Sequence, residues 1–340
     1  MIIIVSLALL VASAFITRQL VMNSHRFSQM DIPNERSSHF TPTPRGGGLS
    51  FVATSIVGFL LLTLNSTIDR ADLLALCCAG IIVAIAGHLD DRQKISGATI
   101  RLGFHALGAI ILIVGIGFPS QISLFDRTID TGIIGSILGV LYLVWLLNLF
   151  NFMDGTDGIA AIEAIFVCIA GAILNYHVLS DINFSAPSII LATSTFGFLL
   201  YNWAPAKIFM GDIGSGYLGI AIGGLSLVAA KQQHELLWVW IILLGVFVSD
   251  ATVTLIRRLL QKQKPHVAHR SHAYQHLAIR FGSHAKVSLL VLAVNVVWLL
   301  PIAFLVADKQ LSGTTGVVVA YVPLLLTVLA LGAGKDSATN

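Results

Sequence analysis

Long apolar runs alternate with polar loops along the chain. Eleven runs can be placed, and each is long enough, or nearly so, to cross a hydrocarbon core of about 30 Å as a helix. They lie near residues 2–20, 49–64, 72–87, 102–118, 133–149, 159–176, 187–203, 217–230, 236–256, 287–306 and 315–333. The pattern predicts an all-α polytopic membrane protein with 10 or 11 transmembrane helices, because the run at 217–230 is short. The polar stretches leave no room for a soluble domain, so residues 1–340 form one transmembrane domain.

Nearly every unusual polar residue falls in every second loop, counted from the first. These odd loops contain residues 33–48, 88–94, 148–158, 204–216 and 266–276, whereas the even loops hold little beyond turn residues. Consecutive membrane helices alternate in direction, so the odd loops share one face of the bilayer. Five polar clusters that are far apart in sequence are therefore predicted to converge, which is the pattern of an active site at a membrane face.

Composition supports the membrane class, and charge orients it. The chain is 56% hydrophobic and 11% charged, about half the charged fraction of a soluble domain. No basic segment precedes the first run, so we expect a retained helix rather than a signal peptide. Counted over the whole stretches between successive apolar runs, the odd loops hold 14 of the 20 Lys and Arg residues. The positive-inside rule then makes these loops cytoplasmic and places the N-terminus outside.

Five carboxylates are predicted at this cytoplasmic face. They are Asp90, Asp91, Asp154, Asp157 and Asp212. Converging carboxylates repel one another unless a divalent cation or basic partners compensate them. The segment 148–158 contains no Lys or Arg, so we expect a cation there. All-oxygen ligands favour Mg²⁺, with Mn²⁺ as the alternative, over zinc. A single loop acid would simply be solvated, but five on one face indicate a site.

Asparagines and acids recur at intervals of three in the third odd loop. Asn148, Asn151, Asp154 and Asp157 form this series, and the first two can share a face at a helix end. Carboxamides there can bond a base edge or a phosphate, whereas in lipid they would be costly. A role in helix packing is the alternative for Asn148.

Two glycine-rich segments lead into helices. The segment TPTPRGGG at 41–48 can expose backbone N–H groups to an anion, with Arg45 as a charged clamp, although it lacks the spacing of a Walker loop. The segment GDIGSG at 211–216 places Asp212 at a helix N-terminus, which favours a phosphate or a metal-bound phosphate. A plain turn is the alternative for 41–48.

The last odd loop is the most basic part of the chain, with seven Lys and Arg residues between 257 and 286. If the segment is helical, His269, His272 and His276 lie along one face. A three-histidine zinc site is one reading of this pattern, and a surface attracted to lipid headgroups is another. Because Arg270 lies among the histidines, contacts with phosphate and sugar are favoured.

Some ionisable residues fall inside the apolar runs. Asp250 is expected just below the cytoplasmic face as a component of the site, whereas Glu163 and His177 are expected near the membrane interfaces. A coupled transporter is the rival class of protein. It would place ionisable residues near the midplane and break its helices in matched halves. This chain places its acids at one rim, which favours an enzyme.

Five motifs together resemble a known family. PTPRGGG, HLDD, NLFNFMDGTDGIA, YNWAPAKIFMGDIGSGYLG and HRSHAYQHL occur in that order. They are similar to the polyprenyl-phosphate N-acetylhexosamine-1-phosphate transferases of glycosyltransferase family 4, which are bacterial membrane enzymes. The segments PNERSSH and HRSHAYQH look most like the branch that initiates O-antigen synthesis in lipopolysaccharide. The alternatives are the enterobacterial-common-antigen and peptidoglycan lipid I types, which use a different UDP-sugar.

The resemblance implies Mg²⁺-dependent transfer of an N-acetylhexosamine 1-phosphate from a UDP-sugar to undecaprenyl phosphate, with release of UMP, at the bacterial inner membrane. Asp212 and Asp154 would hold the metal, while Asp90 and Asp91 would position the lipid phosphate, with any role as a base secondary. Asp90, Asp91 and Asp212 are thus the catalytic candidates. Nucleotide and sugar contacts fall to Arg45, Asn148, Asn151, Asp154, Asp157, Asn202, Phe209, His269, Arg270 and His272. Membrane lipids are expected partners and nucleic acid is not, and the oligomeric state stays open, a homodimer included.

Overall fold

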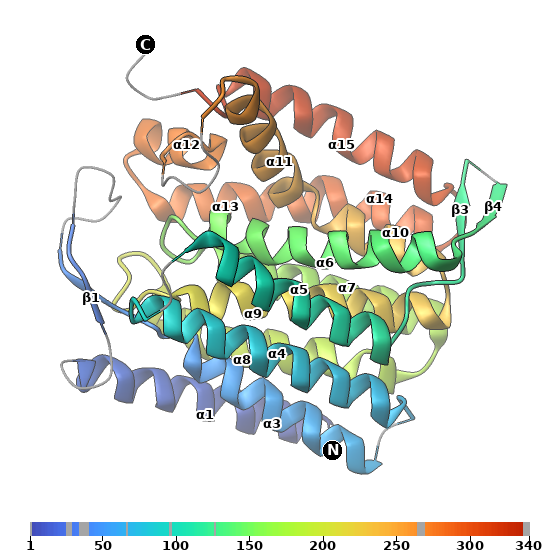
Figure 1. Ribbon diagram of the computed structural model, residues 1–340, viewed down its shortest axis with the longest axis horizontal. Coiled ribbons are helices and arrows are strands. Elements are labelled where there is room, and N and C mark those ends of the chain that lie inside the picture. The colour runs from blue at the N-terminus through green and yellow to red at the C-terminus, as the bar shows by residue number, and fades with distance from the viewer. Residues whose placement is uncertain are drawn as a thin grey trace.

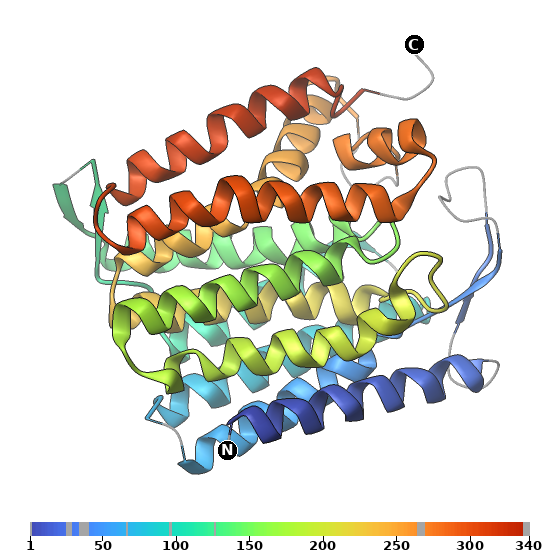
Figure 2. The same cartoon turned by 180° about the vertical axis from the view of Figure 1, so that it is seen from behind.

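The computed structural model describes residues 2–24, 29–33, 41–65, 67–94, 97–125, 127–263 and 269–335. Within these residues the long helices form one bundle and run along a common direction (Figure 1, Figure 2). Nine of the described helices are long and apolar enough to cross a membrane, and a bent pair makes a tenth. A shorter apolar helix at Leu49–Leu64 matches the predicted run there. The structure confirms an all-α polytopic membrane protein.

The helices follow the predicted order, and short strands and helix α12 are added in the loops. The helices are α1 (Ile2–Met22), α3 (Leu49–Asn65), α4 (Arg70–Asp91), α5 (Ala98–Gly115), α6 (Gly132–Met153), α7 (Ile159–Leu179), α8 (Ala186–Asn202), α9 (Asp212–Gln232), α10 (Glu235–Leu243), α11 (Gly245–Leu260), α12 (Ala273–Phe281), α13 (His284–Val294), α14 (Leu300–Ala307) and α15 (Gly313–Ala330). The antiparallel strand pairs are β1 (Gln29–Asp31) with β2 (Thr43–Arg45), and β3 (Gln121–Leu124) with β4 (Arg127–Asp130).

Helix α9 is the centre of the bundle. The apolar run at 217–230 was the shortest predicted span, yet the helix extends over 21 residues and its apolar window is entirely buried. Its glycines allow this position: a Cβ on Gly219 would lie 2.6 Å from the Leu146 carbonyl oxygen of α6. On the other side, a Cβ on Gly87 of α4 would collide with the Asp212 carbonyl. These contacts bring the ends of α4 and α6 against the beginning of α9.

The predicted single run at 236–256 is broken in the structure. Helices α10 and α11 meet at Leu244 and are bent by 71°. Gly245 starts α11, and a Cβ there would lie 3.1 Å from the Leu299 side chain, so the break lies against a close neighbour. Glu163 of α7, which was expected near a membrane interface, is fully buried in the bundle and accepts a hydrogen bond from Asn295 Nδ2.

The described parts of the odd loops gather at one end of the bundle, with β1, β2 and α12 (Figure 1). We call this end the odd-loop face. The opposite end carries the β3–β4 hairpin, which the sequence did not predict, and Phe125 N–H in its turn donates to Thr314 Oγ1 at 2.9 Å. Residues 34–40 and 264–268 of two predicted odd loops lie outside the described residues.

Candidate active site at the odd-loop face

Two aspartates and an arginine from three odd loops meet at the start of α9. The N–H groups of Asp212 and Ile213 donate to Asp91 Oδ1 and Oδ2 at 2.9 and 3.1 Å, so the carboxylate that ends α4 caps α9. Arg45 Nε lies 3.0 Å from Asp91 Oδ1, and its Nη2 donates to Asp212 Oδ1. The close approach depends on Gly211, since it has φ +76° and a Cβ would lie 2.6 Å from Asp91 Oδ2.

The glycine segment after Arg45 serves packing rather than anion binding. The N–H groups of Gly46 and Gly47 donate to the Phe209 carbonyl at 3.2 and 2.9 Å, and that of Gly48 donates to the Met210 carbonyl at 2.9 Å. These donors are therefore occupied by the protein itself, and the predicted anion nest at 41–48 is wrong. The segment instead joins the first odd loop to the fourth and aims the Arg45 side chain at the acids.

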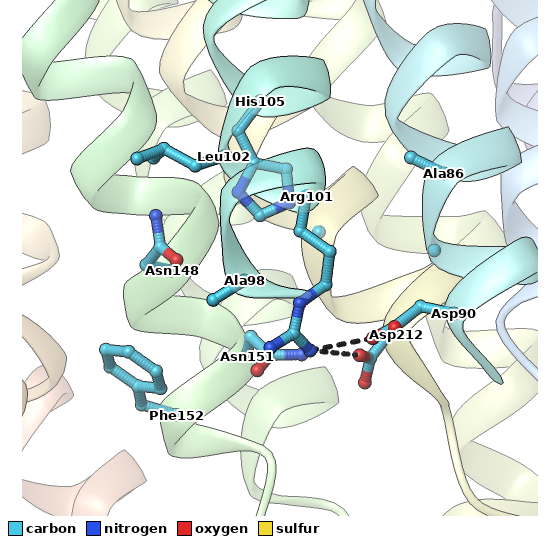
Figure 3. A pocket seen from close by; sticks show the side chains of 12 residues that line it. Ala86, Asp90, Ala98, Arg101, Leu102, His105, Asn148, Asn151, Phe152 and Asp212 are labelled. Atoms are coloured by element: carbon cyan, nitrogen blue, oxygen red, sulfur yellow. Dashed lines mark hydrogen bonds and ion pairs between the residues drawn. The ribbon is translucent and has the colours of Figure 1, made fainter. Parts of the chain in front are cut away.

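A first cavity, of about 240 Å³, lies between α4, α5, α6 and α9 beside Asp212 (Figure 3). Arg101 Nη1 is 2.7 Å from Asp90 Oδ2 and 3.7 Å from Asp212 Oδ2. One turn further along α5, His105 also lines the cavity, and its buried Nδ1 has no hydrogen-bond partner among the described residues. The cavity therefore holds an acid pair bridged by a guanidinium, with an unpaired imidazole nitrogen beside it.

The two predicted asparagines line the same cavity from α6 (Figure 3). Asn148 Nδ2 donates to the Val144 carbonyl of its own helix at 2.7 Å, and Asn151 Nδ2 donates to Ser215 Oγ at 3.2 Å. Ser215 belongs to the GDIGSG segment, so Asn151 ties the third odd loop to the fourth.

A second cavity, of about 690 Å³, opens between the first, third, fourth and fifth odd loops. Its lining includes Asp157, Phe209, Arg270 and His284. Asp157 Oδ2 accepts the Ala206 N–H at 3.1 Å and lies 3.3 Å from His284 Nδ1. The carboxylate, the aromatic ring and the guanidinium that the sequence assigned to donor binding thus share one cavity, next to the acid centre.

This chain is similar to known proteins over the part that contains these acids. Residues 73–230, which include Asp90, Asp91 and Asp212, match glycosyl transferase family 4. A probable undecaprenyl-phosphate N-acetylglucosaminyl 1-phosphate transferase of Bacillus subtilis is 29% identical, over 78% of this chain and 74% of its own. These matches support the family that the five motifs indicated, the polyprenyl-phosphate N-acetylhexosamine-1-phosphate transferases.

Other family 4 relatives differ in the names they carry. A decaprenyl-phosphate N-acetylglucosaminephosphotransferase of Mycolicibacterium smegmatis is 28% identical over 92% of this chain and 84% of its own. A phospho-N-acetylmuramoyl-pentapeptide-transferase of Prochlorococcus marinus is 32% identical over 65% and 64%. These relatives are phospho-sugar transferases, and the resemblance read from the five motifs to polyprenyl-phosphate N-acetylhexosamine-1-phosphate transferases is confirmed at the level of the family.

The candidate site has more acid than base at its centre. Asp90, Asp91, Asp154 and Asp212 contribute four carboxylates, against the guanidiniums of Arg45 and Arg101. Burial raises the pKa of Asp154 well above its usual value; Arg45 opposes this, while Asp212 and Asp91 add to it. The described residues gather no group of three or more ligands for a metal. Since Mg²⁺ uses one or two carboxylates together with substrate phosphates, the excess of acid fits that ion.

Asn202 occupies a different position from the one that family resemblance suggested. Its Oδ1 accepts the Gly158 N–H at 3.1 Å, and its Nδ2 donates to the Ile208 carbonyl at 2.9 Å. Both ends of this buried amide are engaged. We therefore assign Asn202 to holding the third and fourth odd loops together, and not to the uracil edge.

Residues 269–272 precede α12, and we call them the basic turn. Two of the basic residues predicted to bind the donor differ here: His272 is buried, whereas Arg270 lines the larger cavity. Among the described residues of this loop the helix begins at Ala273, so the condition for three histidines along one helical face is not met. His272 is 3% exposed and its Nδ1 lies 3.2 Å from Asp250 Oδ1. Asp250 also accepts the N–H groups of Ala273 and Tyr274 at 3.0 and 2.9 Å, so it anchors the turn.

The Nδ1 atoms of His269, His272 and His276 have separate partners, and the described residues bring no three such ligands together for a metal. His269 Nδ1 pairs with Ser271 Oγ at 2.9 Å, and the His269 ring stacks on that of His272 at 5.1 Å between centroids. His276 Nδ1 is 3.0 Å from the Leu331 carbonyl oxygen. The arrangement leaves Arg270 as the residue of the turn that lines the larger cavity.

Arg101 and His105 line the first cavity, and the sequence analysis did not assign either of them to the site. They fall four positions apart at the start of the fourth apolar run, in RLGFH. That spacing puts both on one helix face, and a charged residue at a helix start that follows an odd loop was a usable signal.

Proposed function

We propose that the protein transfers N-acetylglucosamine 1-phosphate from UDP-N-acetylglucosamine to undecaprenyl phosphate. The observation that carries the proposal is the meeting of Asp90, Asp212, Arg45 and Arg101 between two cavities at one end of a membrane bundle. The names of the Bacillus subtilis and Mycolicibacterium smegmatis relatives support N-acetylglucosamine as the sugar.

The reaction forms one P–O bond and breaks another. An oxygen of the acceptor phosphate attacks the phosphorus that carries the sugar, and the bond from that phosphorus to the bridging oxygen breaks, so UMP leaves. A phosphate monoester has its second pKa near about 6 and is mostly dianionic at neutral pH. Catalysis then rests mainly on positioning and charge neutralisation. Asp90, which pairs with Arg101, suits positioning of the acceptor rather than removal of a proton.

The two cavities suit the two substrates. The smaller cavity offers Arg101 and His105 to a phosphate, and Leu102 beside them is 50% exposed on the outside of α5, where a lipid chain can lie. The larger cavity offers the Phe209 ring for stacking on uracil, Asp157 for its polar edge and Arg270 for the diphosphate. Asp212 and Arg45 lie between these groups, where the reacting phosphorus belongs.

The cation in this proposal is Mg²⁺, with Mn²⁺ as the substitute. Asp212 and Asp154 would hold it, and it would supply positive charge next to the diphosphate. Arg45 contacts Asp91 and Asp212 from the first odd loop, and so holds the Asp212 carboxylate in place before substrate arrives.

Orientation and pathway belong to the same proposal. Sugar nucleotides are cytoplasmic, and the basic odd loops suit a cytoplasmic face. We place the odd-loop face in the cytoplasm and the protein in the bacterial inner membrane. Its lipid product would initiate O-antigen or another cell-envelope polysaccharide.

The test uses the purified protein in lipid vesicles with undecaprenyl phosphate, Mg²⁺ and one radiolabelled UDP-sugar at a time. The panel contains UDP-N-acetylglucosamine, UDP-N-acetylgalactosamine and UDP-N-acetylmuramoyl-pentapeptide. We expect N-acetylglucosamine to enter the lipid with one UMP released per sugar, and Asp212→Asn to serve as the inactive control. Preference for the muramoyl-pentapeptide would move the protein to the lipid I type, and no labelled lipid from any donor would overturn the proposal.

A further inference from the structure

The five residues that follow α15 turn back towards the active site. Gly332 has φ +84°, and the N–H of Ala333 donates to the Val328 carbonyl at 3.1 Å, as the N–H of Gly332 does to that of Leu329. A glycine in the left-handed region with these two bonds is a Schellman end, which stops a helix and fixes the direction of the chain beyond it. Residues 331–335 are thus held in a defined path.

Three hydrogen bonds join residues 331–335 to the basic turn and to the helices beside it. They run from His276 Nδ1 to the Leu331 carbonyl at 3.0 Å, from Arg257 Nη1 to the Ala333 carbonyl at 2.8 Å, and from the Gly334 N–H to the Ser271 carbonyl at 2.7 Å. Because a carbonyl can only accept, His276 carries its proton on Nδ1.

Apolar packing fixes the same junction. Ala333 is fully buried and forms a small cluster with Val328 of α15 and Ala273, the first residue of α12. Gly334 has φ +78°, and a Cβ on it would lie 2.7 Å from Arg257 Cβ. The segment therefore lies close against both α11 and α12, and neither helix can shift without disturbing it.

These contacts reach Ser271, which is adjacent in sequence to Arg270 of the larger cavity, the proposed donor site. Asp250 fixes His272 and the start of α12, whereas Gly334 fixes Ser271, the residue next to Arg270. The Ser271 hydroxyl in turn bonds to His269 Nδ1 at 2.9 Å. We propose that residues 331–335 are a positioning element of the donor site, which sets the place of Arg270 and His269 for the UDP-sugar. This inference rests on the proposed function of the larger cavity.

The test compares two substitutions of His276 in the full chain. His276→Ala removes the bond to the Leu331 carbonyl, whereas His276→Asn keeps it, because the amide nitrogen of asparagine can stand where the imidazole Nδ1 stands. We expect the KM for UDP-N-acetylglucosamine to rise about fivefold in the alanine variant and to stay within about twofold of wild type in the asparagine variant. The kcat and the KM for undecaprenyl phosphate should stay within about twofold in both.

A pair of shortened chains gives a second measurement. A chain that ends at Leu331 loses the bonds from Ala333 and Gly334, and its donor KM should rise at least about tenfold. A chain that ends at Lys335 keeps all three bonds and is the matched control. If the shorter chain does not fold, the His276 pair decides.

Arg270→Ala, measured in parallel, separates failure of this inference from failure of the proposed function. A raised donor KM in Arg270→Ala with unchanged values in His276→Ala overturns the positioning role and leaves the function standing. Equal changes in kcat, in both KM values and in the unfolding temperature of His276→Ala would show general packing and also overturn it. A wild-type protein that transfers no sugar overturns the function and this inference with it.

Discussion

Asp90 and Asp91 are adjacent in sequence, but asparagine substitutions should separate them. The Asp91 carboxylate is 6% exposed and binds two N–H groups of α9 and Arg45 Nε. The Asp90 carboxylate is 16% exposed, faces the smaller cavity and pairs with Arg101, which is 37% exposed. We expect Asp91→Asn to destabilise the protein and Asp90→Asn to leave its stability nearly unchanged.

The expected loss of folding stability follows from the hydrogen-bond partners of each carboxylate. Asparagine keeps one oxygen at position 91, but its NH₂ group must face a donor, either an N–H of α9 or the Arg45 guanidinium. At least one hydrogen bond to a charged group is lost, worth about 1.5–3 kcal/mol, and a donor is left facing a donor. We therefore expect a loss of about 3 kcal/mol. The partly exposed Asp90–Arg101 pair is worth about 0–1 kcal/mol.

The assay is thermal unfolding of each purified variant in detergent, combined with sugar transfer. Asp91→Asn should unfold at a clearly lower temperature and transfer little sugar, because Asp212 loses its support. Asp90→Asn should unfold at the same temperature as wild type and show a raised KM for undecaprenyl phosphate. Equal unfolding temperatures for the two variants, or a less stable Asp90→Asn, would refute this division of roles.

Further predictions concern the metal, the orientation and the two cavities. Asp212→Asn should slow UMP release by about 100-fold or more, and substantial activity of this variant would remove Asp212 from the proposed metal site. EDTA should abolish the wild-type rate, and added Mg²⁺ should restore it. In a cysteine-free background, a cysteine at Ser283 should be shielded from impermeant reagents in intact cells and one at Ser120 should be labelled, whereas the reverse pattern would place the odd-loop face outside. Arg101→Ala should raise the acceptor KM about tenfold with little change in the donor KM, and an unchanged acceptor KM would reassign the smaller cavity. Arg270→Ala should weaken use of the donor by about 1.5–3 kcal/mol, measured as kcat/KM for the UDP-sugar, without changing the Mg²⁺ dependence.

The sequence predicted the spans and the convergence of the odd loops because both follow from alternation alone. An apolar run of sufficient length is a candidate to cross the bilayer, and each crossing reverses the chain. The contacts of Arg45 with Asp91 and Asp212, and of Asp157 with Ala206, confirm that loops far apart in sequence meet.

Assignment of single residues could not be predicted in the same way. Asn202 lies in a motif of the family, but whether its amide faces a ligand or two backbone groups depends on the path of the loop at 204–211. His272 is one of several imidazoles in sequence, and its burial depends on Asp250, 22 residues away. The bend at Leu244 is equally hidden, because α10 and α11 read as one apolar run.

The spacing of the site contacts along the chain bears on how the protein is made. Arg45 and Asp212 are 167 residues apart, and Arg257 and Ala333 are 76 apart. A chain emerging from the ribosome carries Arg45 and Asp91 into the bilayer well before Asp212 exists. Among the described residues, 331–335 leave the ribosome last, so until then the basic turn is held by Asp250 and lacks its hydrogen bond from Gly334. Synthesis thus orders assembly: the contacts of residues 331–335 with Arg257 and Ser271 can form only after α15 has been made.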